Sequence, residues 1–181
     1  MRKYQKIVLS VLMVLITSLV AGTAAPQNSD IETDNLKAAF IYNFTKYITW
    51  PDSEGYPEFR IGVLGYSKIT ESLEKVASKK TVDGKSIEVY HFSTIQNLVP
   101  CQILFVSSSE KDNIPEIISA LKNSPTLTLT IGDTDGFCER GIMINFFSQN
   151  STIKFEMNPV SVKNAGLIAS SQLQKLARIV P

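Results

Sequence analysis

LKAAFIYNFTKYITWP, residues 36–51, has the spacing of an amphipathic helix, and the rest of the fold is predicted outward from it. Wound at 3.6 residues per turn, one helix face collects five positions: Leu36, Phe40, Asn43, Phe44 and Tyr47. We expect this face to pack on a core, with Asp34 as the N-cap and Pro51 ending the helix. Asn43 is then an amide on a buried face, where it is either a core amide that fixes packing or a contact for a ligand.

The N-terminal 25 residues have the pattern of a secretory signal peptide. Basic residues precede an apolar run at 7–20, and small residues follow at 21–25. The run is shorter than the ~20 residues that a membrane-spanning helix needs, so we expect cleavage between about Ala21 and Ala25 rather than an anchor. Residues 26–33 are predicted to be a flexible leader and residues 34–181 a single α/β domain.

The charge balance excludes some classes of partner. The signal peptide holds three of the 18 basic residues and none of the 17 acidic ones, which leaves 15 basic and 17 acidic residues in the mature chain. A nearly neutral chain lacks the basic surface that nucleic acids or anionic membranes attract. We therefore expect no nucleic-acid partner and no direct membrane insertion after cleavage.

Strand and helix patterns alternate along the mature chain. Six segments have the composition of strands: 59–65, 86–92, 101–106, 126–132, 142–147 and 152–157. Helical spacing follows most of them, at 67–77, 93–98, 111–122, from 159 and from 170 to 178. Alternation of this kind is typical of parallel βαβ units, whereas the last two strands are predicted to pair antiparallel. The expected fold is a three-layer α/β sandwich, with a mixed sheet of five or six strands and helices on both faces.

Several segments in the same order resemble the YfiR-like family of periplasmic proteins. They are KYITWP at 46–51, RIGVLG at 60–65, CQILFVS at 101–107, GF at 136–137, GIMINF at 141–146, KFEMN at 154–158 and SSQLQKLAR at 170–178. The resemblance runs from about Leu36 to Val180. It implies a periplasmic, non-enzymatic regulator that binds and inhibits the extracytoplasmic domain of a membrane-bound diguanylate cyclase or sensor kinase. It also makes a homodimer an open alternative, because relatives can self-associate.

The residues offer little catalytic chemistry. His91 is the sole histidine, and no pattern supplies it with a nucleophile or an orienting group. No His or Cys cluster has the spacing of metal ligands, and Asp133-Thr-Asp135-Gly136 lacks the further donors of a calcium loop. We therefore predict no enzyme activity, no metal and no cofactor.

Two sets of residues are candidates for binding. An aromatic pair near the first loop, Trp50 and Tyr56, and the charged pair Glu139 and Arg140 in a glycine-flanked loop are the partner-binding candidates. The alternative function is a periplasmic small-ligand binding module, with its site where the strands at 59–65 and 101–106 end. Its ligand-binding candidates are Asn43, Ser67, Ser107 and Ser108.

Cys101 and Cys138 are the two cysteines. In the oxidising cell envelope they could form one disulfide, although spacing alone does not show that they meet. Relatives can carry other cysteines near these positions, and this chain lacks them. A bridge, two free thiols, or one buried and one exposed thiol all remain open.

Overall fold

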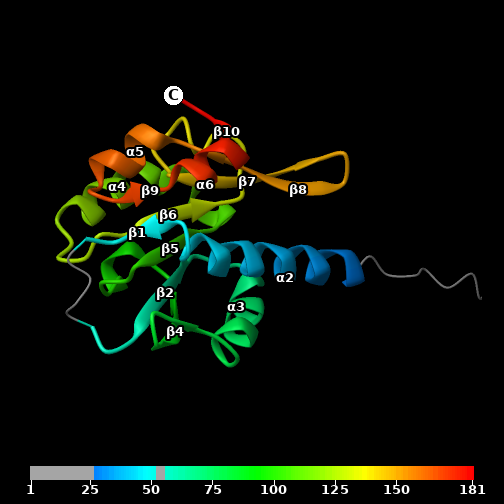
Figure 1. The fold of residues 1–181 in the computed structure, drawn as a ribbon, viewed down its shortest axis with the longest axis horizontal. Coiled ribbons are helices and arrows are strands. Elements are labelled where there is room, and N and C mark those ends of the chain that lie inside the picture. The colour runs from blue at the N-terminus through cyan, green and yellow to red at the C-terminus, as the bar shows by residue number, and fades with distance from the viewer. Residues whose placement is uncertain (1–26, 52–55) are drawn as a thin grey trace, which may run out of the picture. The chain divides into compact units, whose positions relative to one another are not determined.

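The computed structural model describes residues 27–51 and 56–181, so the predicted signal peptide lies outside the described residues. Residues 31–181 form one compact unit, and residues up to Asp30 are grouped separately. The fold of the larger unit follows here, with its elements labelled as in Figure 1.

The unit is built on a mixed eight-stranded sheet with the strand order β10-β8-β7-β6-β5-β2-β4-β3. Neighbouring strands from β7 through β6, β5 and β2 to β4 run parallel, as do β8 and β10, whereas β7–β8 and β3–β4 are antiparallel. The strands are β2 (Phe59–Leu64), β3 (Thr81–Val82), β4 (Lys85–Phe92), β5 (Ile103–Val106), β6 (Leu129–Gly132), β7 (Ile144–Gln149), β8 (Thr152–Met157) and β10 (Arg178–Ile179). A separate antiparallel pair joins β1 (Ile48–Thr49) to β9 (Ile168–Ala169). The prediction of an α/β fold with a mixed sheet is confirmed.

The predicted count of five or six strands is wrong, because two short edge strands were missed. β3 and β10 have two residues each, which is too short for an alternating pattern to show. β3 forms a hairpin with β4 through Asp83 and Gly84, which both have positive φ. Arg178, the first residue of β10, was assigned to the last helix, which ends at Leu176.

Both faces of the central strands are buried under helices and loops. In β5, Ile103 and Phe105 belong to the core cluster that includes α2, α3, α5 and α6. Leu104 and Val106 belong to a second cluster, which includes Ile114 and Ile117 of α4. The helices are α2 (Gln27–Phe44), α3 (Ile69–Ala77), α4 (Ile114–Lys122), α5 (Pro159–Asn164) and α6 (Ser171–Leu176), with short 3₁₀ turns at η2 (Ile95–Asn97) and η3 (Ser108–Asn113). Alternate side chains of one strand therefore serve two cores.

Helix α2 differs from its prediction at both ends. It begins at Gln27, so residues 27–33 of the expected leader are helical and Asp34 lies inside the helix instead of capping it. It ends at Phe44, well before Pro51, and the chain continues through a turn into β1. The domain boundaries themselves stay predictions.

The buried face of α2 is also rotated from the predicted one. Ala38, Ile41 and Phe44 are buried, whereas Asn43 is exposed and Leu36 is 44% exposed. Apolar side chains occupy almost every position from 38 to 44, so the sequence pattern is compatible with two different buried helix faces. Tertiary packing selects the face that contains the small residue Ala38. Phe44 fixes the contact: its ring lies 5.0 Å from that of Phe155, edge to face.

Truncation of Phe44 should therefore unfold the protein more easily than truncation of its neighbour. Phe44→Ala leaves a cavity in the core and should lower the free energy of unfolding by about 3–5 kcal/mol. Asn43→Ala, the matched control, should stay within about 0.5 kcal/mol, because Asn43 bonds only to exposed Lys46. Urea denaturation measures both, and an equal loss for the two variants would contradict this packing of α2.

Candidate functional site

Trp50 and Tyr56 are half-buried and tie the first loop to the sheet. The Trp50 Nε1 donates to the Gln102 carbonyl at 3.0 Å, and its ring packs edge to face on Phe59 at 5.4 Å. The Tyr56 hydroxyl accepts from Thr126 Oγ1 at 3.1 Å, and the Arg60 guanidinium stacks over the Tyr56 ring at 4.5 Å. Both predicted partner residues therefore have structural contacts and only part of each ring is left to contact a partner.

Glu139 and Arg140 are exposed in the loop between β6 and β7. Neither forms an ion pair with the part of the chain that the structure describes. The Glu139 carboxylate does raise the pKa of the Arg178 guanidinium, after the larger effect of Glu156. The charge of Glu139 thus acts on a side chain of the C-terminal strand β10.

The predicted ligand-binding serines are used inside the fold. Ser107 is buried and its Oγ lies 2.7 Å from that of Ser109, and both hydroxyls pack against Gly65, where a Cβ would collide with them. Ser67 accepts from the Ile69 amide at 3.3 Å at the start of α3. Ser108 is exposed at the beginning of η3. The loops after β2 and β5 are therefore held together by these side chains.

Neither Asn43 nor His91 forms a side-chain hydrogen bond with these serines. Asn43, predicted on the buried face, is exposed and accepts from Lys46 Nζ at 3.1 Å, so the prediction that it is buried is wrong. His91 is exposed on β4, with its Nε2 3.0 Å from the Gly65 carbonyl. Nowhere in residues 27–51 and 56–181 do three His, Cys, Asp or Glu side chains gather closely enough to hold a metal ion.

A row of polar side chains that was not predicted from the sequence crosses the β7, β8 and β10 strands. Asn145 and Glu156 are cross-strand partners, as are Glu156 and Arg178. The buried Asn145 donates to Glu156 Oε1 at 3.0 Å and accepts from the Thr134 amide at 3.1 Å. Arg178 donates to Glu156 Oε2 through Nε at 3.1 Å and also through Nη2, and this hydrogen bonding raises the Arg178 pKa. The only indication in the sequence is one polar residue in each of two apolar strand segments, Asn145 in INFF and Glu156 in FEM.

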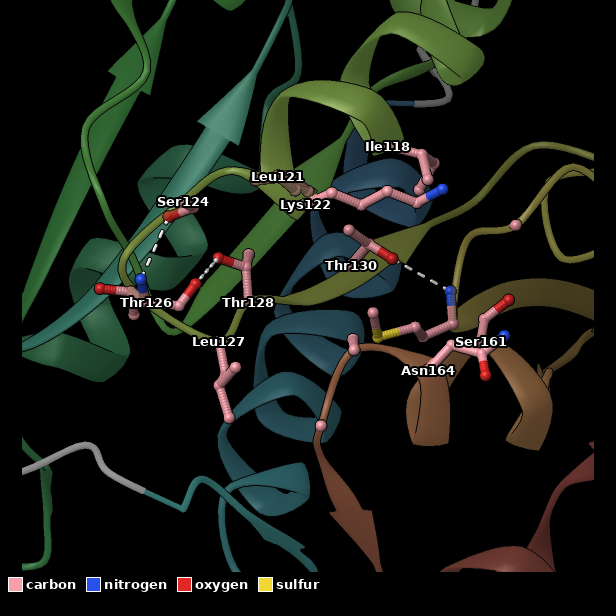
Figure 2. Close-up of a pocket in the computed structure, with 14 residues that line it drawn as sticks. Ile118, Leu121, Lys122, Ser124, Thr126, Leu127, Thr128, Thr130, Ser161 and Asn164 are labelled. Atoms are coloured by element: carbon pink, nitrogen blue, oxygen red, sulfur yellow. Dashed lines mark hydrogen bonds between the residues drawn. The ribbon is translucent and has the colours of Figure 1, made fainter.

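A cavity of about 490 Å³ lies beside β6. Figure 2 shows its walls, which come from the C-terminal half of α4, the segment that enters β6, the residues before β7, and α5. The lining residues are Ile118, Leu121, Lys122, Ser124, Thr126, Leu127, Thr128, Thr130, Gly141, Met143, Ser161, Asn164, Ala165 and Gly166. None of the residues predicted to bind a ligand lines it.

Cys101 and Cys138 are free thiols and both are buried, in separate surroundings. Burial raises the pKa of the Cys101 thiol to about 12, against a smaller opposite effect of Arg60. Burial also raises the pKa of the Cys138 thiol, and the carboxylates of Glu156 and Glu139 add to it. Of the three open alternatives, the structure has two free thiols, neither of them exposed.

Comparisons with known proteins agree with this architecture. A family model described as YfiR/HmsC-like matches residues 34–178. No curated protein matches the chain significantly. Two solved structures superpose on 82% of the chain at 12% identity: a conserved domain protein from Vibrio cholerae O1 biovar El Tor, with a TM-score of 0.59, and the ABC domain in complex with L-Trp from Streptococcus pneumoniae, with a TM-score of 0.54. The chain spans 60% of the length of each, and at this identity the likeness shows the fold alone.

The polar row should contribute to stability through Asn145. Asn145→Ala would leave the Thr134 amide and one Glu156 oxygen without their partner, so the free energy of unfolding should fall by about 1–3 kcal/mol. Gln149→Ala is the control on the same strand, because Gln149 bonds only to exposed Lys154, and it should change little. Urea midpoints compare the two, and a loss from Gln149→Ala as large as that from Asn145→Ala would contradict the role of the row.

The thiols should be protected in the native protein. Without reductant, iodoacetamide near neutral pH should modify neither cysteine in the folded protein and both in denaturant, as counted by intact mass. If the two cysteines are labelled in denaturant only after a reductant is added, they form a disulfide in the native protein.

For Cys101 the ordinary pKa is 9.0 and the native one about 12, so its contribution to stability is complete below pH 9.0 and is lost as the pH rises toward 12. Native protection should accordingly persist at mildly alkaline pH.

Proposed function

The chain belongs to the YfiR/HmsC-like family, and on that premise we propose that it is a periplasmic, non-enzymatic regulator of cyclic-di-GMP signalling. It binds the extracytoplasmic domain of a membrane signalling protein, of the diguanylate cyclase or sensor kinase type, and inhibits it by contact. The family match over residues 34–178 is the observation that carries this proposal. Among the described helices none has the length and apolar character to cross a membrane.

An exposed apolar surface near the C-terminus supports recognition of another protein. Ile168 on β9 is 58% exposed, Leu176 on α6 is 66% exposed and Ile179 on β10 is 50% exposed. All three come from one continuous stretch, which we call the C-terminal apolar surface. An exposed apolar patch is typical of an interaction site, and we propose that these three side chains contribute to one.

The predicted partner residue Trp50 lies next to this surface in the fold. β1 pairs with β9 so that Thr49 is opposite Ile168, and the Ser170 amide donates to the Tyr47 carbonyl at 2.8 Å. At the other end of the stretch, β10 is the last strand of the sheet, and its outer edge has no strand beside it in the described chain. A partner could therefore contact exposed side chains and also pair with an open edge.

Inhibition by contact has a thermodynamic limit. The regulator can hold the sensor inactive only to the extent that it binds the inactive conformation more tightly than the active one. A homodimer that uses the C-terminal apolar surface would compete with this binding, so self-association is an alternative use of the same residues.

The C-terminal apolar surface should be required for inhibition in cells. The double variant Ile168→Ser, Leu176→Ser removes two exposed anchors, and its affinity for the sensor should fall at least about tenfold. In cells deleted for the gene, cyclic-di-GMP should rise; the wild-type copy should lower it again and the double variant should not. Val99→Ser changes an exposed valine outside this surface and should behave as wild type.

Crosslinking of a tagged copy in the same cells identifies the sensor that is bound. An unchanged cyclic-di-GMP level on deletion would contradict the proposed output, and full complementation by the double variant would contradict the proposed surface. Trp50→Ala is a poorer test, because it also removes the packing on Phe59 and the bond to Gln102.

The second candidate function is a periplasmic small-ligand binding module, and the cavity beside β6 favours it. A cavity of about 490 Å³ has the size of sites that hold small molecules. Its position differs from the predicted site at the ends of β2 and β5.

A further inference from the structure

We propose that the cavity beside β6 binds a small organic anion that has an apolar body the size of a ring system. The inference rests on the second candidate function, ligand binding, and does not require the membrane partner. Three properties of the cavity carry it: the apolar walls, a buried hydroxyl with an unused proton, and a single charged side chain, which is a lysine.

The apolar walls define the body of the ligand. Ile118 and Leu121 reach the cavity from α4, and Leu127 reaches it from the segment before β6 (Figure 2). Met143 and Ala165 add apolar side chains from two other segments. Elsewhere on this face of the sheet, α4 packs directly on β2 and β5 through Ile114 and Ile117. Beside β6 the packing is left open and about 490 Å³ remains, which is enough for a fused ring system with a short acidic group.

Thr130 supplies a buried hydrogen-bond donor. Its side chain is fully buried, and its Oγ1 accepts from the Met143 amide at 3.1 Å (Figure 2). The hydroxyl proton is donated to no protein atom of the described chain, and because Thr130 is part of the cavity wall we infer that a ligand in the cavity accepts it. Thr128 differs, because its hydroxyl donates to the Cys101 carbonyl at 2.7 Å. The Thr130 oxygen already has one partner, and an acceptor group of a ligand would add a second hydrogen bond through the hydroxyl proton.

The charge of the lining favours an anion. Lys122 is the one charged residue among those that line the cavity, and no carboxylate is present. The carbonyl groups at the end of α4 could oppose an anion, but Ala120 and Leu121 already accept from the amides of Asn123 and Ser124. Ser124, Ser161 and Asn164 add further hydrogen-bond donors around the opening.

Two dyes with one ring system test the proposal. 1-Anilinonaphthalene-8-sulfonate carries a sulfonate, and N-phenyl-1-naphthylamine is the same molecule without it. Titrated into the folded mature chain, the anionic dye should bind saturably at one site and fluoresce. Lys122→Gln should weaken its binding about two- to fivefold, as expected for a partly exposed ion pair, and leave the neutral dye unchanged.

Matched variants complete the test. Lys111→Gln removes the same charge from an exposed lysine of η3 outside the cavity and should leave both dyes unchanged. Ala165→Phe fills the cavity and should weaken both dyes at least about tenfold. Circular dichroism and the urea midpoint verify folding, and Ser161→Leu, from the same wall, replaces Ala165→Phe if that variant does not fold.

Three results would overturn the proposal. They are the absence of saturable binding of the anionic dye, binding that survives in a folded variant with a filled cavity, and an equal effect of Lys122→Gln on both dyes. Because the membrane sensor is absent from the titration, none of these results bears on the proposed regulation.

Discussion

The burial of both faces of β2, β5 and β6 is the constraint on which the rest of the structure depends. Strands buried on both faces need cover on each side, and the chain supplies α2 with α3, α5 and α6 for one face and α4 for the other. Close packing requires glycine at one point of β2: a Cβ at Gly62 would lie 2.7 Å from the Phe92 ring and 3.2 Å from the Cys101 sulfur. The Cys101 thiol is therefore part of the packing, and its burial explains why its pKa is raised.

The long elements of this fold could be predicted from the sequence because each buries a regular pattern. The six long strands were found from their apolar runs, whereas the two-residue strands β3 and β10 exist only because a neighbouring strand pairs with them. The buried face of α2 could not be chosen from periodicity, since apolar residues occupy both possible faces and tertiary packing decides between them. The helical start at Gln27 was hidden for the opposite reason, because residues 27–33 have no apolar stripe to show it.

The candidate sites were harder to predict than the fold, because tertiary packing decides which side chains meet. Serines that precede a helix suggested a ligand site, but Ser107 and Ser109 fill the space beside Gly65. The polar row depends on residues that meet only across strands, such as Asn145 and Glu156. The cavity depends on residues of α4 and α5 that are far apart in sequence, such as Lys122 and Ser161. Single polar residues within apolar strands were the available indication, and their meaning depends on strand order, which the sequence does not state.

The cavity and the C-terminal apolar surface are connected through α5. Ser161, Asn164, Ala165 and Gly166 line the cavity, and Ile168 of the exposed surface follows two residues later on β9, which contacts α5. A ligand in the cavity therefore touches the segment that positions a proposed partner contact. It would alter partner binding only if it bound one arrangement of α5 and β9 more tightly than another, and the coupling would then act equally in both directions. Ligand binding and regulation by contact are, on this geometry, two properties that one domain can combine.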